Sequence, residues 1–433
     1  MPQLRPFRGL RYDPRFRPDA AALLCPPYDV ISAGERARLA ALDPRNAVHV
    51  ELPVGAEGRD PYEHAAALFA SWRAGGVLCR DDRPLVYAYE QVYSAARGGP
   101  LAARGFYCLL RLEDLAPGGG VRRHEHTMAG PKEDRYRLLR AVEANLSPVV
   151  LLYESGNDGA AAASALARLM NGRPALEADG ADGADGADSA GEGAHRLWTA
   201  DPAVDAAAAS LLELAAACPL TIADGHHRYE TALRYRDERR AGAQDAGPAE
   251  WLMVLLVEAV SGGLSVLPTH RLVEEVADGA QRLLFAAQEL FRLTPVEDRQ
   301  ALLAALDRPG RLGLWTAERG VLLEPLPEAL ASLLPAGTDA LRQLDVSALS
   351  AALPRLVGEE TQALLDSGRL HYVKDANEAI SRAGEADGAA FLLPATPVRA
   401  VLEVAAAGEQ MPHKSTYFEP KPATGLVFNA LAE

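Results

Sequence analysis

The sequence predicts a mixed α/β (α+β) fold. Its 433 residues are 48% hydrophobic and 24% charged, which is typical of a globular protein with two or three domains. Short apolar or aromatic runs alternate with helical segments that Pro and Gly delimit, so strands and helices are mixed along the chain. These patterns do not predict the order of the strands.

The N-terminal elements are predicted from local signals. Residues 61–76 are expected to form a helix, because Pro61 suits a first turn and Gly75 suits an end. The aromatic run 85–93 alternates as a strand does. Residues 104–115 follow as its hairpin partner, after a Gly-Gly turn.

The later elements alternate between the two types. They are a helix at 201–217, a strand at 219–225, a helix at 226–241, a buried strand at 251–259, a helix at 277–291, strands at 311–317 and 320–326, and a strand, helix, strand and helix across 371–409.

A low-complexity segment divides the chain. Residues 176–195 repeat Ala-Asp-Gly, are acidic and have few large apolar side chains, so they cannot offset the entropy of ordering. We therefore expect an N-terminal α+β region (1–175), a flexible surface insert (176–195) and a C-terminal α/β region (196–433).

Composition excludes several classes of protein. The net charge of −15 argues against nonspecific binding of nucleic acid, although a small basic pocket is compatible with it. No apolar run reaches the roughly 18 residues of a membrane span, and the polar N-terminus has no signal-peptide core. The four cysteines are far apart and predict neither a disulfide framework nor a metal site. We expect a reduced, cytoplasmic protein.

The segment TIADGHHRYETALRY (221–235) carries the first candidate site. A strand ends, Gly225 permits a tight turn, and a helix begins with His226, His227 and Arg228. First-turn N–H groups, the helix dipole and an arginine fork favour a phosphate or carboxylate oxygen. The alternative is a helix capped by Asp224, with surface histidines.

Two further segments carry clustered polar residues. Residues 122–141 contain His124, Glu125, His126, Thr127, Lys132 and Arg135, which are expected to form a substrate-contacting loop or, alternatively, a solvated charged loop. Residues 411–428 contain Lys414, Ser415, Thr416 and Lys421, which suit phosphate on a proline-stiffened loop or, alternatively, belong to a packed tail.

Asp29 and the pair His270-Arg271 complete the candidates. Asp29 follows two prolines and a tyrosine, so a carboxylate on a stiff loop is available as a base or metal ligand. Ser32 and Glu35 beside it form a capping box. His270 and Arg271 repeat the His-Arg chemistry after a proline turn.

Five segments together resemble the bacterial domain-of-unknown-function family 1015. They are CPPYDVIS, HEHTMAGPKEDR, IADGHHRYETAL, VLPTHRLV and MPHKSTYFEPKPATGLV, in that family's order. The family name carries no activity. DGHHRYETA is also similar to the helix-start signature of the ParB/sulfiredoxin superfamily, which includes free-serine kinases. That resemblance implies a ParB/sulfiredoxin-like core in which Gly225, His227 and Arg228 face nucleotide phosphates, with His226 where sulfiredoxins carry their cysteine.

Residues and resemblance together predict a phosphotransferase that acts on a small metabolite, such as serine or phosphoserine. The alternatives are a nucleotide-binding regulatory protein without turnover and a phosphate-ester hydrolase. Mg²⁺ and a nucleotide or other phosphate donor are the candidate cofactors. The candidate catalytic residues are Asp29, Asp224, His226 and His227; the phosphate-binding residues are Gly225, Arg228, Lys414, Ser415, Thr416 and Lys421; the substrate-binding residues are His124, Glu125, His126, Thr127, Lys132, Arg135, His270 and Arg271.

Overall fold

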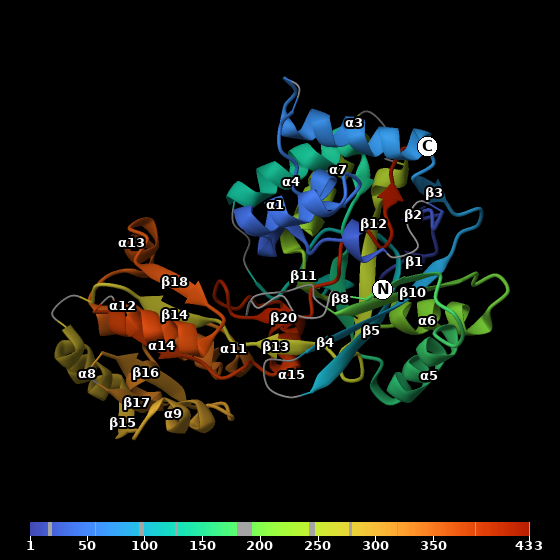
Figure 1. The fold of residues 1–433 in the computed structure, drawn as a ribbon. Coiled ribbons are helices and arrows are strands. Elements are labelled where there is room, and N and C mark those ends of the chain that lie inside the picture. Colours follow the sequence, from blue (N-terminus) through green and yellow to red (C-terminus); the bar gives the residue numbers. More distant parts are fainter. Residues whose placement is uncertain are drawn as a thin grey trace. The chain divides into compact units, whose positions relative to one another are not determined.

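The chain has the predicted mixed α/β fold in a computed structural model (Figure 1). The structure describes residues 1–15, 20–56, 58–94, 99–125, 129–179, 193–241, 247–276, 279–317, 319–385 and 387–432. Among the described helices, none combines the length and the apolar character that crossing a bilayer requires.

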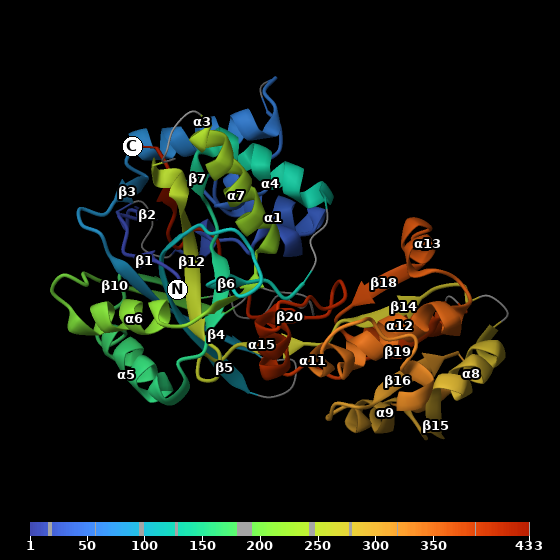
Figure 2. The same cartoon turned by 180° about the vertical axis from the view of Figure 1, so that it is seen from behind.

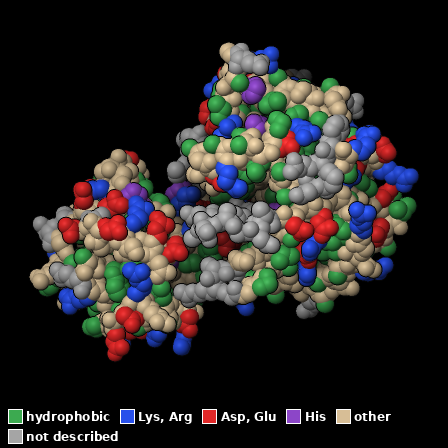
Figure 3. All heavy atoms as spheres, viewed as in Figure 1, with side chains coloured by type: hydrophobic (Ala, Val, Ile, Leu, Met, Phe, Trp, Pro, Cys, Tyr) green, Lys and Arg blue, Asp and Glu red, His purple; other side chains and the backbone are tan. Residues whose placement is uncertain are grey.

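The chain folds into two compact units. Unit 1 comprises Met1–Arg123, Thr127–Ser265 and Glu419–Glu433, and unit 2 comprises His124–His126 and Val266–Phe418. Acidic and basic side chains of the described residues are interspersed on the face that Figure 3 shows.

A nine-stranded sheet forms the centre of unit 1. Its strand order is β6-β11-β8-β12-β5-β4-β10-β9, and β1 also pairs with β5. The adjacent strands β4 and β5 are antiparallel, as the predicted hairpin requires. The strands are β1 (Leu4–Arg5), β4 (Val86–Ser94), β5 (Pro100–Arg111), β6 (Val121–Arg122), β8 (Val149–Tyr153), β9 (Leu176–Ala178), β10 (Ala194–Ala200), β11 (Leu220–Asp224) and β12 (Trp251–Glu258).

The two faces of this sheet differ in chemistry, because successive side chains of a strand point to opposite faces. On one face Phe106 and Val254 belong to a buried apolar cluster with α5 (Gly159–Leu169) and α6 (Ala206–Ala216), which lie side by side in Figure 1. The other face carries the buried polar side chains of Tyr87, Tyr89, Gln91, Tyr107 and His195.

The remaining helices of unit 1 pack around a second apolar core. Phe69 and the C-terminal Phe428 meet there edge to face, with ring centroids 5.6 Å apart. Helix α4 lies beside α7, as seen from behind in Figure 2. The helices are α1 (Ala33–Leu42), α2 (Val48–Glu51), α3 (Pro61–Ala74), α4 (Ala129–Val142) and α7 (His226–Arg240); small ladders pair β2 (Leu10–Tyr12) with β3 (Leu78–Arg80) and β7 (Ala144–Asn145) with β21 (Asn429–Ala430).

Unit 2 contains a six-stranded sheet in the order β15-β17-β16-β19-β14-β18. The predicted strand, helix, strand and helix across 371–409 are present as β18, α14, β19 and α15. The strands are β14 (His270–Val273), β15 (Phe291–Pro295), β16 (Leu312–Thr316), β17 (Gly320–Pro325), β18 (Leu370–Val373) and β19 (Ala389–Leu392); β13 (Ser265–Leu267) pairs separately with β20 (Tyr417–Glu419).

The helices of unit 2 include α8, which the sequence predicted with close bounds, and α14, which it predicted without bounds. Helix α12 ends at Gly358, whose left-handed φ of 81° suits a glycine C-cap. The helices are α8 (Gly279–Leu290), α9 (Arg299–Ala305), α10 (Pro327–Leu330), α11 (Asp339–Arg342), α12 (Asp345–Val357), α13 (Thr361–Asp366), α14 (Ala376–Glu385) and α15 (Val398–Ala406).

The predicted insert (176–195) has strands at both ends. Residues 176–178 form β9, and Ala178 pairs with His195 of β10. Residues 180–192 lie outside the described residues. Described strands therefore occupy both ends of the range 176–195, where the composition of the sequence had predicted a flexible insert throughout. Both sides of the insert belong to unit 1, and the chain passes from unit 1 to unit 2 after Ser265 instead.

Candidate functional site

The site in unit 1 is built on the turn between β11 and α7. Strand β11 ends at Asp224, and Gly225 precedes the helix with φ 88° and no side-chain cap. Only glycine adopts this backbone readily. A Cβ atom on Gly225 would lie 3.0 Å from Nε of Arg228. Gly225 thus allows both the turn and the return of Arg228 toward Asp224.

Asp224 is paired with two cations at the start of α7. Nη2 of Arg228 donates to Oδ2 of Asp224 at 2.6 Å, and Nζ of Lys421 donates to the other oxygen, Oδ1. Nη1 of Arg228 donates to the carbonyl of Pro148. The side chains of Asp224, Arg228 and Lys421 are only 10%, 11% and 5% exposed. Two charges of one sign therefore share a single buried carboxylate.

These contacts control the protonation of Asp224. Burial alone would raise its pKa, but Lys421 and Arg228 outweigh burial and hold the pKa well below its usual range. A carboxylate that holds its charge so firmly accepts a proton poorly. The geometry therefore favours an orienting role for Asp224 over the role of general base that the sequence proposed as one option.

Tyr28 and Asp29 belong to the short 3-10 helix Tyr28–Val30. Both residues interact electrostatically with Arg228. Burial acts to lower the pKa of Arg228, whereas Asp224, Asp29 and Glu51 raise it above its ordinary value. Burial raises the pKa of Tyr28 to about 12, with Asp29 adding to the rise. The side chain of Asp29 is exposed, so it remains available to a ligand.

Glu51 and Arg135 both contact Tyr28. Glu51 accepts hydrogen bonds from the Tyr28 N–H at 3.3 Å and from the Ser147 hydroxyl at 3.1 Å. Arg135 donates to the Glu51 carbonyl at 2.7 Å, and its guanidinium lies 4.1 Å from the centre of the Tyr28 ring. Arg135 therefore supports the loop that carries Asp29.

His226 and His227 occupy the first turn of α7 and are partly exposed. His226 contributes electrostatically to the low pKa of Asp224. Both histidines and Arg228 therefore belong to the same helix start, as the motif predicted.

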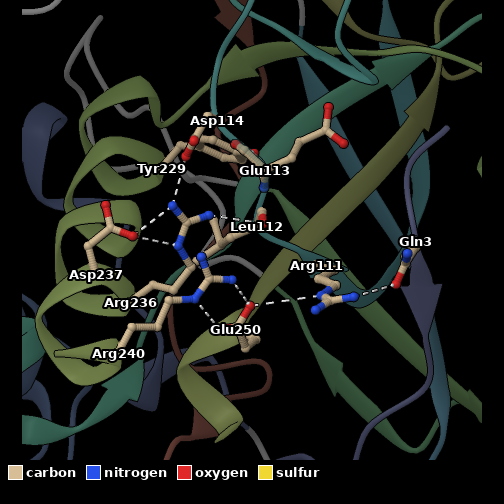
Figure 4. A network of polar contacts seen from close by, with 10 residues as sticks. All are labelled: Gln3, Arg111, Leu112, Glu113, Asp114, Tyr229, Arg236, Asp237, Arg240 and Glu250. Atoms are coloured by element: carbon tan, nitrogen blue, oxygen red, sulfur yellow. Dashed lines mark hydrogen bonds and ion pairs between the residues drawn. The ribbon is translucent and has the colours of Figure 1, made fainter. Parts of the chain in front are cut away.

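The other end of α7 is anchored by the network in Figure 4. The Tyr229 hydroxyl donates to the Glu113 carbonyl at 2.8 Å. Arg236 donates to the Leu112 carbonyl at 3.1 Å and to Asp114 at 2.7 Å. These contacts, together with the pair of Arg240 with Glu250, fix the helix and thereby the position of Arg228 at its start.

Other predicted site residues lie together in unit 2. Nε2 of His124 lies 2.9 Å from Oγ1 of Thr416, and Glu125 accepts from the Lys414 N–H at 2.7 Å. Lys414 is exposed and has a φ of 55°, which is unusual for a side chain larger than glycine. The structure thus joins the HEH segment to the MPHKST segment.

Three predicted residues of unit 2 support its backbone. Ser415 donates to the Pro412 carbonyl. His270 accepts from the Leu393 N–H at 3.1 Å. Arg271 donates to the Lys414 carbonyl at 3.1 Å, and burial lowers its pKa to about 10. Each of these side chains, which the sequence assigned to a ligand, therefore makes a hydrogen bond to the backbone.

One of the remaining predicted residues forms an ion pair, and two lie outside the described residues. Lys132 of α4 forms an ion pair with Glu230 of α7. His126 and Thr127 lie outside the described residues. Of the candidates that the sequence proposed, Arg228 and Asp29 belong to unit 1, and His124 and Lys414 belong to unit 2.

A magnesium site held by protein side chains does not fit the described residues. Within the described ranges, no three His, Cys, Asp or Glu side chains gather as metal ligands. Asp224 already directs one oxygen at each of its two cations, whereas Mg²⁺ requires carboxylate oxygens that it can reach.

Sequence reasoning missed Tyr28, Glu51, Ser147 and Tyr107 as neighbours of the site. Tyr28 stands directly before Asp29, and that adjacency was a usable signal. Glu51 and Ser147 resemble ordinary residues of a helix end and a loop. Tyr107 alternates with core residues in a strand, so its pattern predicts burial and nothing more.

Comparison with known proteins shows weak structural likenesses. A search of curated proteins found no match. The chain is similar to a free serine kinase in complex with AMP, at 12% identity and a TM-score of 0.36, over 70% of this chain and 85% of that chain. It is also similar to SbnI from Staphylococcus aureus, at 10% identity and a TM-score of 0.35, over 71% and 82%.

A third similar structure is a conserved hypothetical protein from Pyrococcus furiosus, at 13% identity and a TM-score of 0.33, over 69% of this chain and 87% of that chain. Likenesses at these TM-scores carry no argument about what this chain binds.

A family model shows to which family the chain belongs. The model of the family described as "Protein of unknown function (DUF1015)" matches residues 4–347, from β1 to the first turn of α12. That range includes the turn at Gly225 and the loop at Asp29. The chain therefore belongs to this family of proteins of unknown function.

Proposed function

We propose that the chain is a nucleotide-dependent phosphotransferase that acts on a small hydroxyl-bearing metabolite, with serine and phosphoserine as the first substrates to test. The observation that carries the proposal is the pairing of one buried carboxylate, Asp224, with two cations at the start of α7. Counted by themselves, Asp224, Arg228 and Lys421 carry about one unit of net positive charge, and the dipole of α7 adds roughly half a unit at the helix start.

That electrostatic arrangement suits a phosphoryl group. Transfer of a phosphoryl group depends mainly on positioning and on neutralising its oxygens. Arg228 and Lys421 supply fixed positive charge, and the first-turn N–H groups of α7 add hydrogen-bond donors. Asp224 holds both cations in place, so little reorganisation is needed when an anion binds.

The chemical step follows from these positions. The acceptor hydroxyl oxygen forms a bond to the transferred phosphorus while the bond from phosphorus to the donor oxygen breaks. The leaving oxygen of the nucleoside polyphosphate takes that electron pair. The hydroxyl proton passes to a base, and we assign this role to Asp29. Asp29 is exposed and lies close enough to Arg228 to raise the pKa of Arg228. His226 and His227 position the phosphate.

The nucleotide and the wider relationship belong to this proposal too. We infer a ParB/sulfiredoxin-like phosphate turn from the DGHHR motif, and the turn at Gly225 supports that inference. The free serine kinase structures similar to this chain were determined in complex with AMP or ADP. The ligand panel contains AMP, ADP, ATP and pyrophosphate, because these ligands differ in the number of phosphate groups that they offer to the turn.

Phosphorus NMR tests the reaction. Purified protein is incubated with each nucleotide or pyrophosphate, with and without serine, and in the reverse direction with phosphoserine. A new phosphate ester that requires both donor and acceptor supports a phosphotransferase. Release of inorganic phosphate without acceptor would identify a hydrolase instead. Binding without any change in the phosphorus spectrum would identify a regulatory nucleotide-binding protein.

Arg228→Ala is the corresponding change in the protein. Loss of a charged hydrogen-bonded contact should weaken phosphate-ligand binding by about 10- to 150-fold, from roughly 1.5–3 kcal/mol. Arg228→Lys should recover only part of the affinity, because lysine keeps the charge but not the fork. Since Arg228 is buried against Asp224, the Ala variant should also melt at a lower temperature.

Calorimetric titration measures these affinities at a temperature where every variant is folded. Arg239→Ala is the matched control: it lies on the same helix, is 57% exposed and pairs with Glu143 at 3.9 Å. Its affinity should equal that of the wild type. Equal affinities for Arg228→Ala and Arg239→Ala would refute the phosphate site.

A further inference from the structure

A row of paired residues crosses the central sheet from Asp224 to Tyr107. A β-bulge between Ile222 and Asp224 turns Asp224 to the face opposite the apolar cluster that holds Ile222, and Asp224 then pairs with Val150 of β8. Val150 in turn pairs with Leu255 of β12. Leu255 pairs with Tyr107 of β5. Paired residues in neighbouring strands direct their side chains to the same face. Asp224 and Tyr107 therefore share the polar face of the sheet, three strand spacings or about 14 Å apart along the row.

Tyr107 is a buried phenol with an unsatisfied hydroxyl. The residue is 1% exposed, and its hydroxyl makes no hydrogen bond to any group in the described part of the chain. The Tyr89 ring packs against it, with centroids 5.6 Å apart. Burial raises the pKa of Tyr107, and the charge of Arg228 opposes the rise. The phenol is thus protonated at neutral pH and lies within electrostatic reach of Arg228.

Arg228 has an unsatisfied donor of its own. Its Nη1 and Nη2 atoms are bonded to Pro148 and Asp224, but its buried Nε–H makes no hydrogen bond within the described residues. Burying a polar group without a partner is unfavourable, because the group loses its hydrogen bonds to water. The Nε–H can only donate. A ligand that satisfies it must bring an acceptor, and an anionic oxygen suits the positive charge of Arg228 and Lys421.

We propose that Tyr107 is a ligand-contacting residue: its hydroxyl donates a hydrogen bond to an oxygen of the same phosphoryl group whose other oxygen accepts from Nε of Arg228. This inference rests on the proposed function and adds a residue and a binding geometry to it. In this arrangement Tyr107 and Arg228 donate to two different oxygens of the ligand. The arrangement therefore favours a group with several anionic oxygens, such as a nucleotide phosphate or pyrophosphate, over a single carboxylate.

Tyr87 provides a matched control on the same face. It pairs with Tyr107 across β4 and β5 and is 0% exposed. Unlike Tyr107, its hydroxyl donates to Asp81 at 2.8 Å and accepts from the Gly9 N–H at 2.7 Å. Tyr87→Phe removes a buried hydroxyl that has hydrogen-bond partners, and Tyr107→Phe removes one that has none among the described residues. The two tyrosines stand on adjacent strands.

The experiment measures thermal melting and calorimetric binding of ADP and pyrophosphate for the wild type and both variants. Tyr107→Phe should melt at or above the wild-type temperature, because an unsatisfied hydroxyl is removed, and should bind about 2- to 13-fold more weakly, as the loss of one hydrogen bond predicts. Tyr87→Phe should melt lower and bind as the wild type does.

The outcomes separate this inference from the proposed function. If Tyr107→Phe binds as tightly as the wild type while Arg228→Ala binds weakly, the role of Tyr107 is refuted and the phosphate site stands. A Tyr107→Phe variant that melts well below the wild type would show that the hydroxyl has a structural partner, which also refutes the role. If the wild type binds neither ADP nor pyrophosphate, the proposed function fails and this inference fails with it.

Discussion

The partners of Asp224 determine whether its carboxylate is charged. The residue is buried, but two cations hold it in the charged form. An isolated buried carboxylate would instead take up a proton more easily. The same residue type at position 29 is exposed. The two aspartates that the sequence offered as equivalent candidates thus differ in burial and in partners, which is why the proposed function gives them different roles.

Asp345 provides a pH-dependent prediction. Burial raises the pKa of Asp345 from its ordinary 3.8 to about 6, although the Gly310 N–H donates to it at 2.9 Å. The folded chain therefore binds the proton more tightly than the unfolded chain. This contribution to stability is complete below about pH 4 and is lost as the pH rises through about 6, leaving a buried charge at neutral pH.

Asp345→Asn removes this titration while keeping an oxygen that can accept from Gly310. Between pH 4 and pH 8, the stability of the variant relative to the wild type should increase by about 1–2 kcal/mol, below the roughly 3 kcal/mol that two pKa units represent. Urea denaturation at both pH values measures the difference. Parallel pH profiles for the two proteins would contradict the prediction.

At the scale of the element, helix α7 depends on the backbone of Gly225, the residue that precedes its first turn. Gly225 has φ 88°, and Gly310 has a nearly identical φ of 87°. Open space surrounds Gly310, with no atom within 4 Å of a Cβ there, whereas a Cβ at Gly225 would meet the guanidinium of Arg228 at 3.0–3.1 Å. The two glycines therefore carry the same conformational cost but different steric costs.

Gly225→Ala should destabilise the fold more than Gly310→Ala does. Each change costs about 1–2 kcal/mol for a left-handed alanine, and Gly225→Ala must also displace Arg228. Phosphate-ligand affinity should fall for Gly225→Ala and stay unchanged for Gly310→Ala. Denaturation curves and titrations of both variants measure these effects. Equal destabilisation with unchanged affinity would mean that Arg228 does not need its present position.

At the scale of the whole molecule, the Ala-Asp-Gly segment is expected to be dispensable. Its sequence has few groups that could pack against a core. Replacing residues 181–191 by a Gly-Ser linker of equal length should change the free energy of unfolding by less than about 0.5–1 kcal/mol. Phosphate-ligand affinity should not change.

An extended replacement is the control for that prediction. If residues 176–179 are also replaced, β9 is lost, including the buried Ala178 and the ion pair of Glu177 with Arg196 at 2.9 Å. This variant should unfold at a lower urea concentration than the shorter replacement. A large loss of stability in the shorter replacement would show that the segment packs against the fold.

The sequence by itself determined most elements and the chemistry of one turn. Helix 61–76 is present as α3, strand 251–259 as β12, and the Gly225 turn followed by a helix as β11 and α7. Capping residues, glycine conformation and hydrophobic period act over a few residues, so they can be recognised locally. The same local rules predicted the donors at the start of α7.

Only the tertiary structure decided which distant groups share that turn. Lys421 reaches Asp224 across 197 positions of sequence, and the register of the sheet sets Tyr107 in the row of Asp224. It also assigned Arg271 and Ser415 to backbone support in unit 2. No local pattern encodes these pairings, because they arise from strand order and from the packing of segments that are far apart in the chain.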